Sequence, residues 1–323
     1  MKAAVVTRFG PPEVLVTSEM PDPVAGPGEV VVDVAAADVL WVETMIRRGL
    51  AGEYFDVTPP YVPGNGVAGR VRAVGEGVDA EWVGREVVAH TAERDGYAEQ
   101  AAVAADGLSP VPAGLDLQTA AALLHDGPTA LRLFDVTGIR PADAVLVVGA
   151  SGGLGIVSVR LARARGARVV AVARDERKLA RIRELGADAV VDSESADWAE
   201  QVRAAFGDEG ATVVLDNIGG QVGQAAFEVV APGGRFSAHG TPSGRFTAID
   251  PERAQRRGIT LSGIREVQLG AADLKRLTEQ ALAEAVAGHI EPMIGQVFPL
   301  AQAAQAHAAI EARTVFGKTL LVT

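Results

Sequence analysis

The feature with the clearest chemical meaning is a glycine-rich turn over residues 149–155, with the sequence GASGGLG. The apolar run 145–148 leads directly into it, and apolar residues at helical spacing follow from Ile156. A strand, a glycine turn and a helix in this order are typical of a dinucleotide site, because the backbone can approach a pyrophosphate and the helix N-terminus offers N–H groups. We therefore predict a dinucleotide-binding βαβ unit over residues 141–180.

The last three glycines of the turn have two expected tasks. We expect Gly152 and Gly153 to let the pyrophosphate approach, and Gly155 to let the helix pack against the strand. Ser151 and Leu154 adjoin these glycines and should contact the cofactor. The alternative is a tight turn that binds nothing, but three glycines in four residues cost conformational entropy unless something must come close.

The second strand of this unit ends in Val172-Ala173-Arg174 rather than in an acid. Sites for NADH carry an Asp or Glu about 20 residues beyond the turn to hold the ribose 2′-hydroxyl. Arg174 and Lys178, one helical turn further, instead offer two cations to a 2′-phosphate. Asp175 and Glu176 fit the start of the next helix as cap and dipole partners. We predict NADPH as the cofactor; the competing interpretation is that both cations are solvated surface charges.

The composition of the 323 residues limits the class of protein. Hydrophobic residues make up 48% and charged residues 22%, which is typical of a globular protein and allows two domains. The net charge of -11 disfavours a nucleic-acid partner, and the absence of cysteine excludes disulfides and Cys-ligated zinc. No apolar run reaches the roughly 18 residues of a membrane span, and the N-terminus lacks the apolar stretch of a signal peptide. We expect a cytoplasmic protein without a membrane partner.

The elements around the glycine turn alternate between strands and helices. Continuous apolar strands spaced by helices predict a parallel sheet covered on both faces. We therefore expect an α/β fold with a doubly wound, six-stranded Rossmann domain over residues 119–265. Its expected strands are residues 145–148, 168–174, 189–191, 212–215, 235–238 and 260–262.

The first 115 residues have a different pattern. They are rich in Gly and Pro, with short β-branched runs at 29–34, 67–74 and 86–89, which predicts a mostly antiparallel β domain. A helical stretch begins at Leu117. The tail after Ile264 has no nucleotide motif, and we expect it to return to the first domain, which then comprises residues 1–118 and 266–323. The expected tail elements are a helix at 271–287, a strand at 296–298, a helix at 301–312 and a strand at 318–322.

The glycine pattern also occurs in short-chain dehydrogenases, which need a Tyr followed four residues later by a Lys. Every tyrosine here (Tyr54, Tyr61 and Tyr97) precedes the turn, so that family is excluded. Over essentially its whole length the chain resembles the medium-chain dehydrogenase/reductase superfamily, and most closely its zinc-free branch, the NADPH:quinone oxidoreductases with ζ-crystallin. The resemblance rests on GPPEVL at 10–15, PG and VAG within 63–69, GYAE at 96–99, DGPT at 126–129, the glycine turn, and DNIG at 216–219.

This resemblance implies a GroES-like catalytic domain and no metal. The alcohol dehydrogenases of the superfamily bind catalytic zinc through Cys, His and Cys, with a Glu nearby. Their positions correspond here to Leu40, Asn65 and His125, with Gly66 in place of the Glu, and one possible ligand cannot hold zinc. The Ser and His that relay the alcohol proton are also replaced by apolar residues, which argues against alcohol oxidation.

The resemblance points to three candidate catalytic residues. His125, at the former metal position beside the nicotinamide, could donate to an acceptor carbonyl, although a histidine just before a helix is often structural. Tyr54 lies near the position at which related enoyl-thioester reductases carry a Tyr, and could replace it if the loop is rearranged. Glu43 is expected either to pair with a nearby base or to touch substrate or cofactor. Trp41 is expected to be either core or a planar wall for the nicotinamide ring.

The family positions imply further contacts with the cofactor. Thr129 should meet the nicotinamide amide or the ribose. The remaining positions follow the ends of strands or lie in the tail, and ligands of doubly wound sheets bind at the carboxyl ends of strands. These residues are Asn217, His239, Gly240, Thr241, Ile264, Arg265 and Lys318.

The activity implied by the resemblance is an NADPH-dependent oxidoreductase that reduces a quinone or another conjugated carbonyl compound. A quinone needs no strong acid, because the hydroquinone anion is stabilised over two oxygens, whereas an α,β-unsaturated carbonyl needs a proton at Cα. Two alternatives remain: an enoyl-thioester reductase in a biosynthetic pathway, and an NADPH-binding, crystallin-like protein with little turnover. The family also implies a homodimer that pairs the last strands of two nucleotide domains around residues 260–264.

Overall fold

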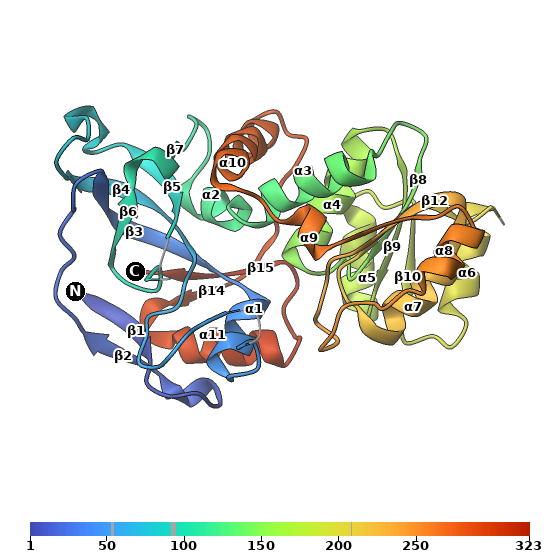
Figure 1. The fold of residues 1–323 in the computed structure, drawn as a ribbon, viewed down its shortest axis with the longest axis horizontal. Coiled ribbons are helices and arrows are strands. Elements are labelled where there is room, and N and C mark those ends of the chain that lie inside the picture. Colours follow the sequence, from blue (N-terminus) through green and yellow to red (C-terminus); the bar gives the residue numbers. More distant parts are fainter. Residues whose placement is uncertain (53–54, 92–94, 208) are drawn as a thin grey trace. The chain divides into compact units, whose positions relative to one another are not determined.

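The computed structural model describes residues 1–52, 55–91, 95–207 and 209–323, and the chain divides into two compact units (Figure 1). Unit 1 comprises Met1–His125, Ala271–Val286 and Pro292–Thr323; unit 2 comprises Asp126–Gly270 and Ala287–Glu291. The boundaries expected after residues 118 and 265 fall later. Helix α2 (Leu117–Leu123) packs on the sheet of unit 1, and helix α9 (Ile264–Val267) packs on the last strand of unit 2.

Unit 2 is built on a six-stranded parallel sheet with the strand order β10-β9-β8-β11-β12-β13. The order runs outward in both directions from the pair β8 and β11, which is the doubly wound arrangement. The predicted Rossmann domain is confirmed. Its strands are β8 (Ala144–Val148), β9 (Arg168–Ala173), β10 (Ala189–Asp192), β11 (Ala211–Asp216), β12 (Val230–Ala238) and β13 (Thr260–Gly263).

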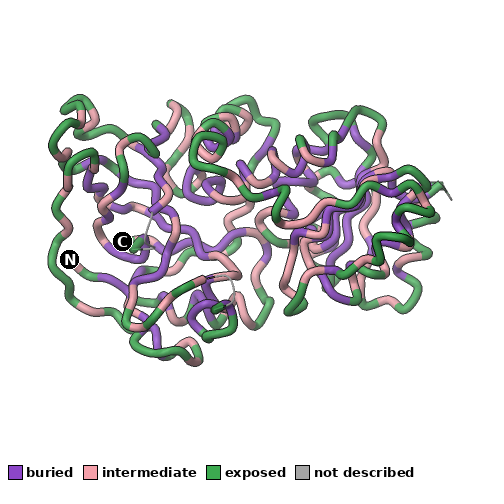
Figure 2. The backbone as a smooth tube through the Cα atoms, viewed as in Figure 1, coloured by how far each residue is buried: buried purple, intermediate pink, exposed green. Residues whose placement is uncertain are grey.

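Helices cover the faces of this sheet. One group packs α3 against α4, and α4 lies on β8 and β9. Helices α6, α7 and α8 contribute Trp198, Phe227 and Ala254 to a core with Leu146 and Phe236 of the strands. Figure 2 shows the strands of this unit as its buried centre. The helices are α3 (Asp126–Thr137), α4 (Gly153–Ala164), α5 (Glu176–Glu184), α6 (Trp198–Phe206), α7 (Gly220–Glu228) and α8 (Pro251–Arg256).

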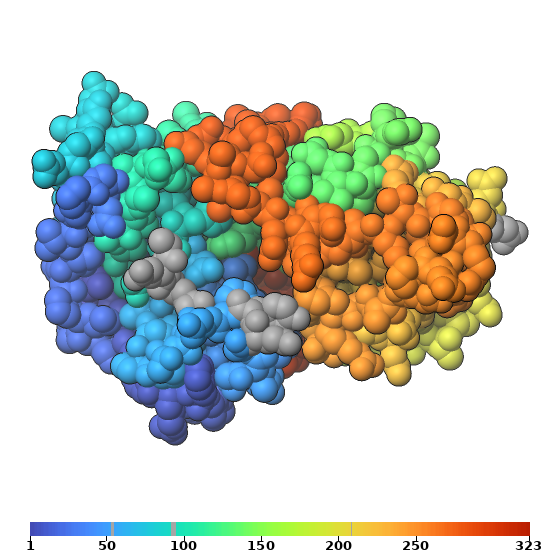
Figure 3. Space-filling view, in the orientation of Figure 1, coloured from blue at the N-terminus to red at the C-terminus, as the bar shows by residue number. Residues whose placement is uncertain are grey.

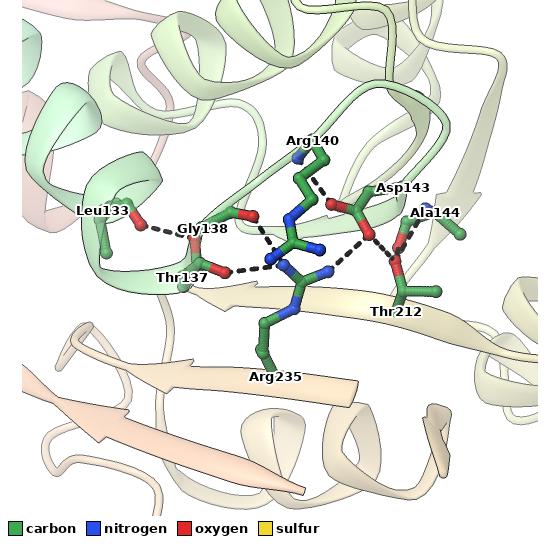
Figure 4. A network of polar contacts seen from close by, with 8 residues as sticks. All are labelled: Leu133, Thr137, Gly138, Arg140, Asp143, Ala144, Thr212 and Arg235. Carbon is green, nitrogen blue, oxygen red and sulfur yellow. Dashed lines mark hydrogen bonds and ion pairs between the residues drawn. The ribbon is translucent and has the colours of Figure 1, made fainter. Parts of the chain in front are cut away.

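A charged network ties together the amino-terminal ends of β8, β11 and β12 (Figure 4). Asp143, just before β8, accepts hydrogen bonds from Arg235 (2.5 Å) and from the hydroxyl of Thr212 (2.8 Å). Arg235 also donates to the carbonyl oxygens of Thr137 (2.9 Å) and Gly138 (2.7 Å). The network therefore fixes the end of the sheet opposite the glycine turn.

Unit 1 contains a seven-stranded sheet, ordered β14-β15-β3-β4-β5-β7 with β6 paired to β3, and a two-stranded sheet of β1 and β2. All its pairs are antiparallel except β14 with β15, so the mostly antiparallel GroES-like domain is confirmed. The strands are β1 (Lys2–Val6), β2 (Leu15–Glu19), β3 (Glu29–Val39), β4 (Gly66–Val74), β5 (Glu86–His90), β6 (Gln100–Ala104), β7 (Ser109–Pro110), β14 (Ile294–Pro299) and β15 (Lys318–Val322).

The helices of unit 1 come from both ends of the chain. The C-terminal segment supplies α10 and α11, and its strand β15 pairs with β3 in the middle of the sheet. The α-helices are α1 (Trp41–Arg47), α2, α10 (Ala271–Val286) and α11 (Ala303–Glu311). Single 3-10 turns occur at Pro12–Val14, Ala80–Trp82, Ala105–Gly107 and Leu300–Gln302.

Three details differ from the sequence prediction. The helical stretch from Leu117 is two helices, because α2 ends at Leu123 and α3 begins at Asp126, and His125 occupies the break. Strand β3 runs on to Val39, since Ala36 and Ala37 pair with both neighbouring strands although they lack the β-branched signal. Strand β9 ends at Ala173, so Arg174 is the first residue after it. Among the described residues, no helix is long and apolar enough to cross a membrane.

Candidate functional site

The glycine turn joins β8 to α4, as the sequence predicts. Gly149 adopts a φ of 73°, in the left-handed region that favours glycine. Gly152 is the N-cap of α4 and no side chain caps this helix, which leaves its N-terminus suited to an anionic group. A Cβ on Gly155 would stand 2.5 Å from the carbonyl oxygen of Gly149 and 2.7 Å from Cα of Ala150. Only glycine therefore lets α4 lie this close to β8.

Five neighbouring strands end at the edge of the sheet that carries this turn. Val148 is in register with Val172 and Asp216, and Ala238 is in register with Asp216 and Gly263. The predicted cofactor residues that follow these strand ends are thereby brought to one edge: Ser151, Gly152, Gly153, Leu154, Arg174, Asn217, His239, Gly240, Thr241, Ile264 and Arg265. Carboxyl ends of parallel strands are where doubly wound sheets bind ligands.

Arg174 and Lys178 follow β9, where a nucleotide's ribose is held in this fold. Arg174 is exposed, and Lys178 is half-buried in the first turn of α5. Burial lowers the pKa of Lys178, the charge of Asp175 opposes this shift, and the positive charge of Arg174 adds to it. Asp175 acts as the expected helix cap, since its carboxylate accepts the N–H of Arg177 at 2.8 Å.

Asn217 and His239 are locked to each other. Asn217 donates through Nδ2 to the carbonyl oxygen of Val148 (2.9 Å), and its Oδ1 lies 2.9 Å from Nε2 of His239. Burial lowers the pKa of His239 to about 4, so this ring is neutral, with Nε2 as the donor and Nδ1 facing Ser237 at 3.1 Å. The bonds fix the loops after β11 and β12 beside the glycine turn.

A hollow of ≈ 370 Å³ lies at the ends of β12 and β13. Two predicted cofactor residues, Ile264 and Arg265, line it together with Phe246 and Thr247. Thr129, also predicted, is half-buried in α3, which packs against α4 and β12. The hollow thus lies at the same edge of the sheet as the strand ends, whereas Thr137, the last residue of α3, lies in the charged network at the opposite edge.

A second polar cluster is centred on His125 in unit 1. Nδ1 of His125 lies 3.1 and 3.0 Å from the two carboxylate oxygens of Asp38, at the end of β3. Nζ of Lys318 lies 2.8 Å from Oδ2 of Asp38. The ring of His90 meets that of His125 edge-on, with centroids 4.7 Å apart. The side chain of Asp38 is fully enclosed, whereas that of His125 keeps 19% of its surface exposed.

The charges of this cluster are set by its contacts. Burial alone would raise the pKa of Asp38, but the positive charges and hydrogen bonds of His125 and Lys318 hold it well below its ordinary value. Asp38 is therefore a carboxylate, which can only accept, so Nδ1 of His125 must carry a hydrogen. Burial and the neighbouring His125 lower the pKa of His90 to about 3, so that ring is neutral.

Glu43 lies in a separate buried network of unit 1. Its Oε2 accepts the N–H of Leu40 (2.9 Å) and the hydroxyl of Tyr97 (2.5 Å). His307, whose pKa burial lowers to about 3, accepts from Nε of Arg47 (3.2 Å) through Nδ1, so its Nε2 faces the oxygen of Tyr97 (3.4 Å) as a donor. These hydrogen bonds run from Arg47 through His307 and Tyr97 to Glu43. Burial raises the pKa of Glu43 to about 7.

The remaining predicted residues are placed as follows. Trp41 begins α1 and is half-buried, with the guanidinium carbon of Arg313 5.6 Å from its ring centroid; within the described residues its Nε1 makes no hydrogen bond. Lys318, expected at the cofactor, is buried in unit 1 with its ammonium on Asp38. Tyr54 lies outside the described residues. The cofactor role of Lys318 and the catalytic roles of Tyr54 and Glu43 stay predictions.

Gly66 and His125, which both align with the zinc site of the alcohol dehydrogenases, lie side by side in unit 1. A Cβ on Gly66, next to Asn65, would stand 2.8 Å from Cε1 of His125, and Leu40 follows Asp38 by two residues. Over the ranges that the structure describes, no group of three or more His, Asp or Glu side chains could hold a metal ion.

Sequence reasoning assigned no role to four residues of these clusters: Asp38, His90, Tyr97 and His307. A signal existed for Asp38, because an acid between the three alanines before it and Val39 after it is unusual within a buried strand. Its partners, however, lie 87 residues away at His125 and near the C-terminus at Lys318. The roles of Tyr97 and His307 had no local signal, since each is set by contacts distant in the sequence.

Comparisons with known proteins agree with this architecture. The zinc-binding dehydrogenase family matches residues 153–283, and the alcohol dehydrogenase GroES-like domain matches residues 26–113. The quinone oxidoreductase of Rattus norvegicus is 31% identical over 309 residues, covering 95% of this chain and 93% of the relative. The 2-haloacrylate reductase of a Burkholderia species is 31% identical over 330 residues, covering 99% and 98%.

Solved structures show the same fold over the whole chain. A mycobacterial protein complexed with NADPH has a TM-score of 0.89 and 30% identity, with 100% of both chains covered. A structure described as an NAD-dependent alcohol dehydrogenase has a TM-score of 0.89 and 31% identity, again with 100% of both chains covered. The chain is an oxidoreductase that belongs to the medium-chain dehydrogenase/reductase superfamily, in the family of the quinone oxidoreductases.

Proposed function

We propose that this protein is a zinc-independent reductase that transfers hydride from NADPH to a quinone or another conjugated carbonyl compound. The observation that carries the cofactor choice is the pair Arg174 and Lys178 directly after β9. An NAD site needs an acid there for the ribose 2′-hydroxyl, and an acid would repel a 2′-phosphate. Two cations at this place fit the phosphate instead.

The residues of unit 2 fit a dinucleotide. The uncapped N-terminus of α4 can receive the pyrophosphate, and the space beyond Gly152 is open, because an added Cβ there meets only one atom, 3.8 Å away. NADPH, when bound, supplies the hydride. The chain's own residues hold it at the strand ends, through the glycine turn, Arg174 and Lys178, and exclude water from the acceptor. The mycobacterial neighbour complexed with NADPH supports this reading, whereas the NAD-dependent neighbour argues for a direct test.

The acceptor class follows from what the relatives' substrates share. One relative is named for quinones and another for 2-haloacrylates, and both compounds carry a C=C bond conjugated to a carbonyl group. Zinc independence is supported by the donor set, since Leu40 cannot bind a metal and Gly66 supplies no carboxylate. Reduction then depends on hydride placement and, where needed, on a proton from a side chain.

Steady-state kinetics with both cofactors test the proposal. The double variant Arg174→Ala/Lys178→Ala should raise KM for NADPH about 10- to 100-fold and leave KM for NADH nearly unchanged, because a hydrogen bond to a charged group contributes about 1.5–3 kcal/mol. Arg183→Ala, an exposed arginine on the same helix, is the matched control. Equal or better use of NADH by the unaltered protein would overturn the NADPH assignment. Tight NADPH binding without turnover of any acceptor would favour the crystallin-like alternative.

We also propose a homodimer that pairs β13 of two copies, and a cytoplasmic location. β13 is the edge strand of the six-stranded sheet, and Leu261 on it is 37% exposed. In Figure 3 the segment from α8 to α9, drawn in orange, lies at the surface of unit 2. An unpaired edge with an exposed leucine is suited to strand pairing. Sedimentation equilibrium that gave a monomer at all concentrations would refute this assembly.

A further inference from the structure

We propose that Asp38 is a positioning residue that holds His125 as a proton donor, and that the acceptor is an α,β-unsaturated carbonyl compound protonated by His125 at Cα. This inference rests on the proposed function and narrows its substrate class. It assigns a role to Asp38, an acid that the cofactor site of unit 2 does not use.

The first support is the geometry of the pair. Both oxygens of Asp38 lie within 3.1 Å of Nδ1 of His125, so the carboxylate fixes both the ring plane and the hydrogen on Nδ1. Nε2 of His125 makes no hydrogen bond to any of the residues that the structure describes. A histidine whose one nitrogen is held by a carboxylate and whose other nitrogen is free is arranged for proton transfer.

Lys318 fixes the carboxylate in turn. Its ammonium lies 2.8 Å from Oδ2 of Asp38, and both side chains are almost completely enclosed. A buried carboxylate is costly unless it is paired, and this one has the ammonium of Lys318 on one side and the Nδ1–H of His125 on the other. The side chain of His125 is by contrast 19% exposed, so His125 is the accessible member of the three residues Lys318, Asp38 and His125.

The charged and titratable groups around His125 come from four elements. Asp38 lies on β3, His90 on β5 and Lys318 on β15, while Glu43 of α1 interacts with His125 through its charge. His90 is neutral and contributes no competing proton donor, and its Nε2 has no partner within the described residues. The Asp38 carboxylate is thus the group that directly contacts the ring as an acceptor.

This arrangement matches a reaction that needs a proton. Hydride from NADPH forms the new C–H bond at Cβ, and the electrons of the C=C bond move toward the carbonyl oxygen to give an enolate. The enolate carbon Cα then takes the proton from Nε2 of the His125 imidazolium. The products are the saturated carbonyl compound, the oxidised cofactor and neutral imidazole, which regains its proton from solvent. A quinone would not need this donor, because its hydroquinone anion is stable enough to be protonated by water.

Two substitutions distinguish a role of Asp38 in positioning His125 from a role in packing alone. His125→Gln removes the proton donor from a partly exposed side chain. Asp38→Asn keeps the shape of the acid, but Lys318, which can only donate, should attract the amide oxygen, so that the amide N–H₂ faces Nδ1 of His125. Nδ1 must then accept, and the imidazolium is disfavoured. Asp33→Asn, an exposed acid on the same strand, is the matched control.

The probes are 1,4-benzoquinone, which needs no protein acid, and 2-chloroacrylate with its methyl ester, whose product has a stereocentre at Cα. We expect both variants to lower kcat for the chloroacrylate acceptors by about 100-fold or more, and to change benzoquinone reduction by less than about 3-fold. The unaltered protein should give one product enantiomer in excess, and the variants should lose that excess. Asp33→Asn should behave like the unaltered protein.

A measurement without cofactor tests the Asp38–His125 pair (the dyad) directly. Histidine ¹⁵N NMR, with the His125 signals assigned through His125→Gln, should show the Nδ1–H form of its neutral ring in the unaltered protein and the Nε2–H form in Asp38→Asn. An Nε2–H form in the unaltered protein would overturn the positioning role.

The outcomes distinguish this inference from the proposed function. If benzoquinone is reduced but the chloroacrylate acceptors are not, the inference fails while the reductase stands. It also fails if both variants lose both activities equally, which indicates a structural role, or if the enantiomeric excess persists. If NADPH is not oxidised with any acceptor, the proposed function fails, and the inference that rests on it fails with it.

Discussion

The substitution Glu43→Gln should make unit 1 more stable at neutral and alkaline pH. Glu43 is 4% exposed, and its Oε2 already accepts from the backbone of Leu40 and from Tyr97. Its other oxygen, Oε1, has no partner among the described residues. Burial raises the pKa of Glu43 to about 7, although those two hydrogen bonds act in the opposite direction. Glutamine reproduces the protonated acid, with an acceptor in the place of Oε2 and N–H₂ in the place of Oε1.

The magnitude follows from proton linkage. The ordinary pKa of Glu is 4.5, and the folded value is about 7, so the folded state binds this proton more tightly than the unfolded state. The stabilisation is therefore complete below about pH 4.5 and is lost as pH rises through 7. At 1.36 kcal/mol for each unit of pKa, the loss amounts to about 3 kcal/mol. Glu43→Gln has no such loss, so its advantage in unfolding free energy should grow from near zero at about pH 4 to about 3 kcal/mol at about pH 8.

Urea unfolding at several pH values measures this difference. Trp198→Phe in both proteins leaves Trp41 and Trp82, which belong to unit 1, as the fluorescent reporters. Glu86→Gln, at an exposed ion pair with Arg70, is the control and should show no comparable change. A difference in unfolding free energy that stayed constant with pH, or that decreased as pH rose, would refute the reasoning.

Two further predictions concern unit 2. Gly155→Ala should destabilise the unit by about 1–3 kcal/mol and weaken NADPH binding at least 10-fold, because the new Cβ would stand 2.5 Å from the carbonyl oxygen of Gly149. Gly152→Ala is the comparison for this variant, and it should weaken NADPH binding without lowering Tm. Asp143→Ala should lower the unfolding free energy of unit 2 by about 3 kcal/mol, since it leaves the mostly buried Arg235 without its carboxylate, and should not change the dissociation constant of NADPH measured by fluorescence titration.

The parts of the fold and site that the sequence predicted are those encoded by adjacent residues. The glycine turn is one continuous segment, and the tasks of Gly152 and Gly155 follow from the backbone alone. Arg174, after β9, was predicted from the end of an apolar run, whereas Asn217 and His239, after β11 and β12, were predicted from the family resemblance. His125 was expected just before a helix, and α3 does begin at Asp126, but no Gly or Pro between Leu117 and Asp126 marks the end of α2 at Leu123.

The clusters of unit 1 could not be predicted in the same way. Lys318 was expected at the cofactor because of its family position, and nothing near it in the sequence indicates a contact with Asp38. That contact depends on the pairing of β15 with β3, where Thr319 is in register with Val39. Likewise, Tyr97 reaches Glu43 only because the chain brings residues 54 positions apart together. Non-local pairing decides these contacts, and a single sequence does not encode it in any local pattern.

Asp38 and Glu43 show how partners decide the charge of a buried acid. They are five positions apart in the sequence and both are enclosed, yet the pKa of Asp38 is lowered and that of Glu43 is raised. Asp38 contacts the ammonium of Lys318 and the imidazole of His125, which can take up a proton. Glu43 receives hydrogen bonds only from neutral groups, the backbone N–H of Leu40 and the hydroxyl of Tyr97. Asp38 therefore stays ionised and keeps its hold on His125, while Glu43 adds a negative charge near that ring as pH rises through about 7. Because Glu43→Gln removes the second charge and leaves the first, the difference in the pH dependence of acrylate reduction between this variant and the unaltered protein measures the effect of the Glu43 charge on that reaction.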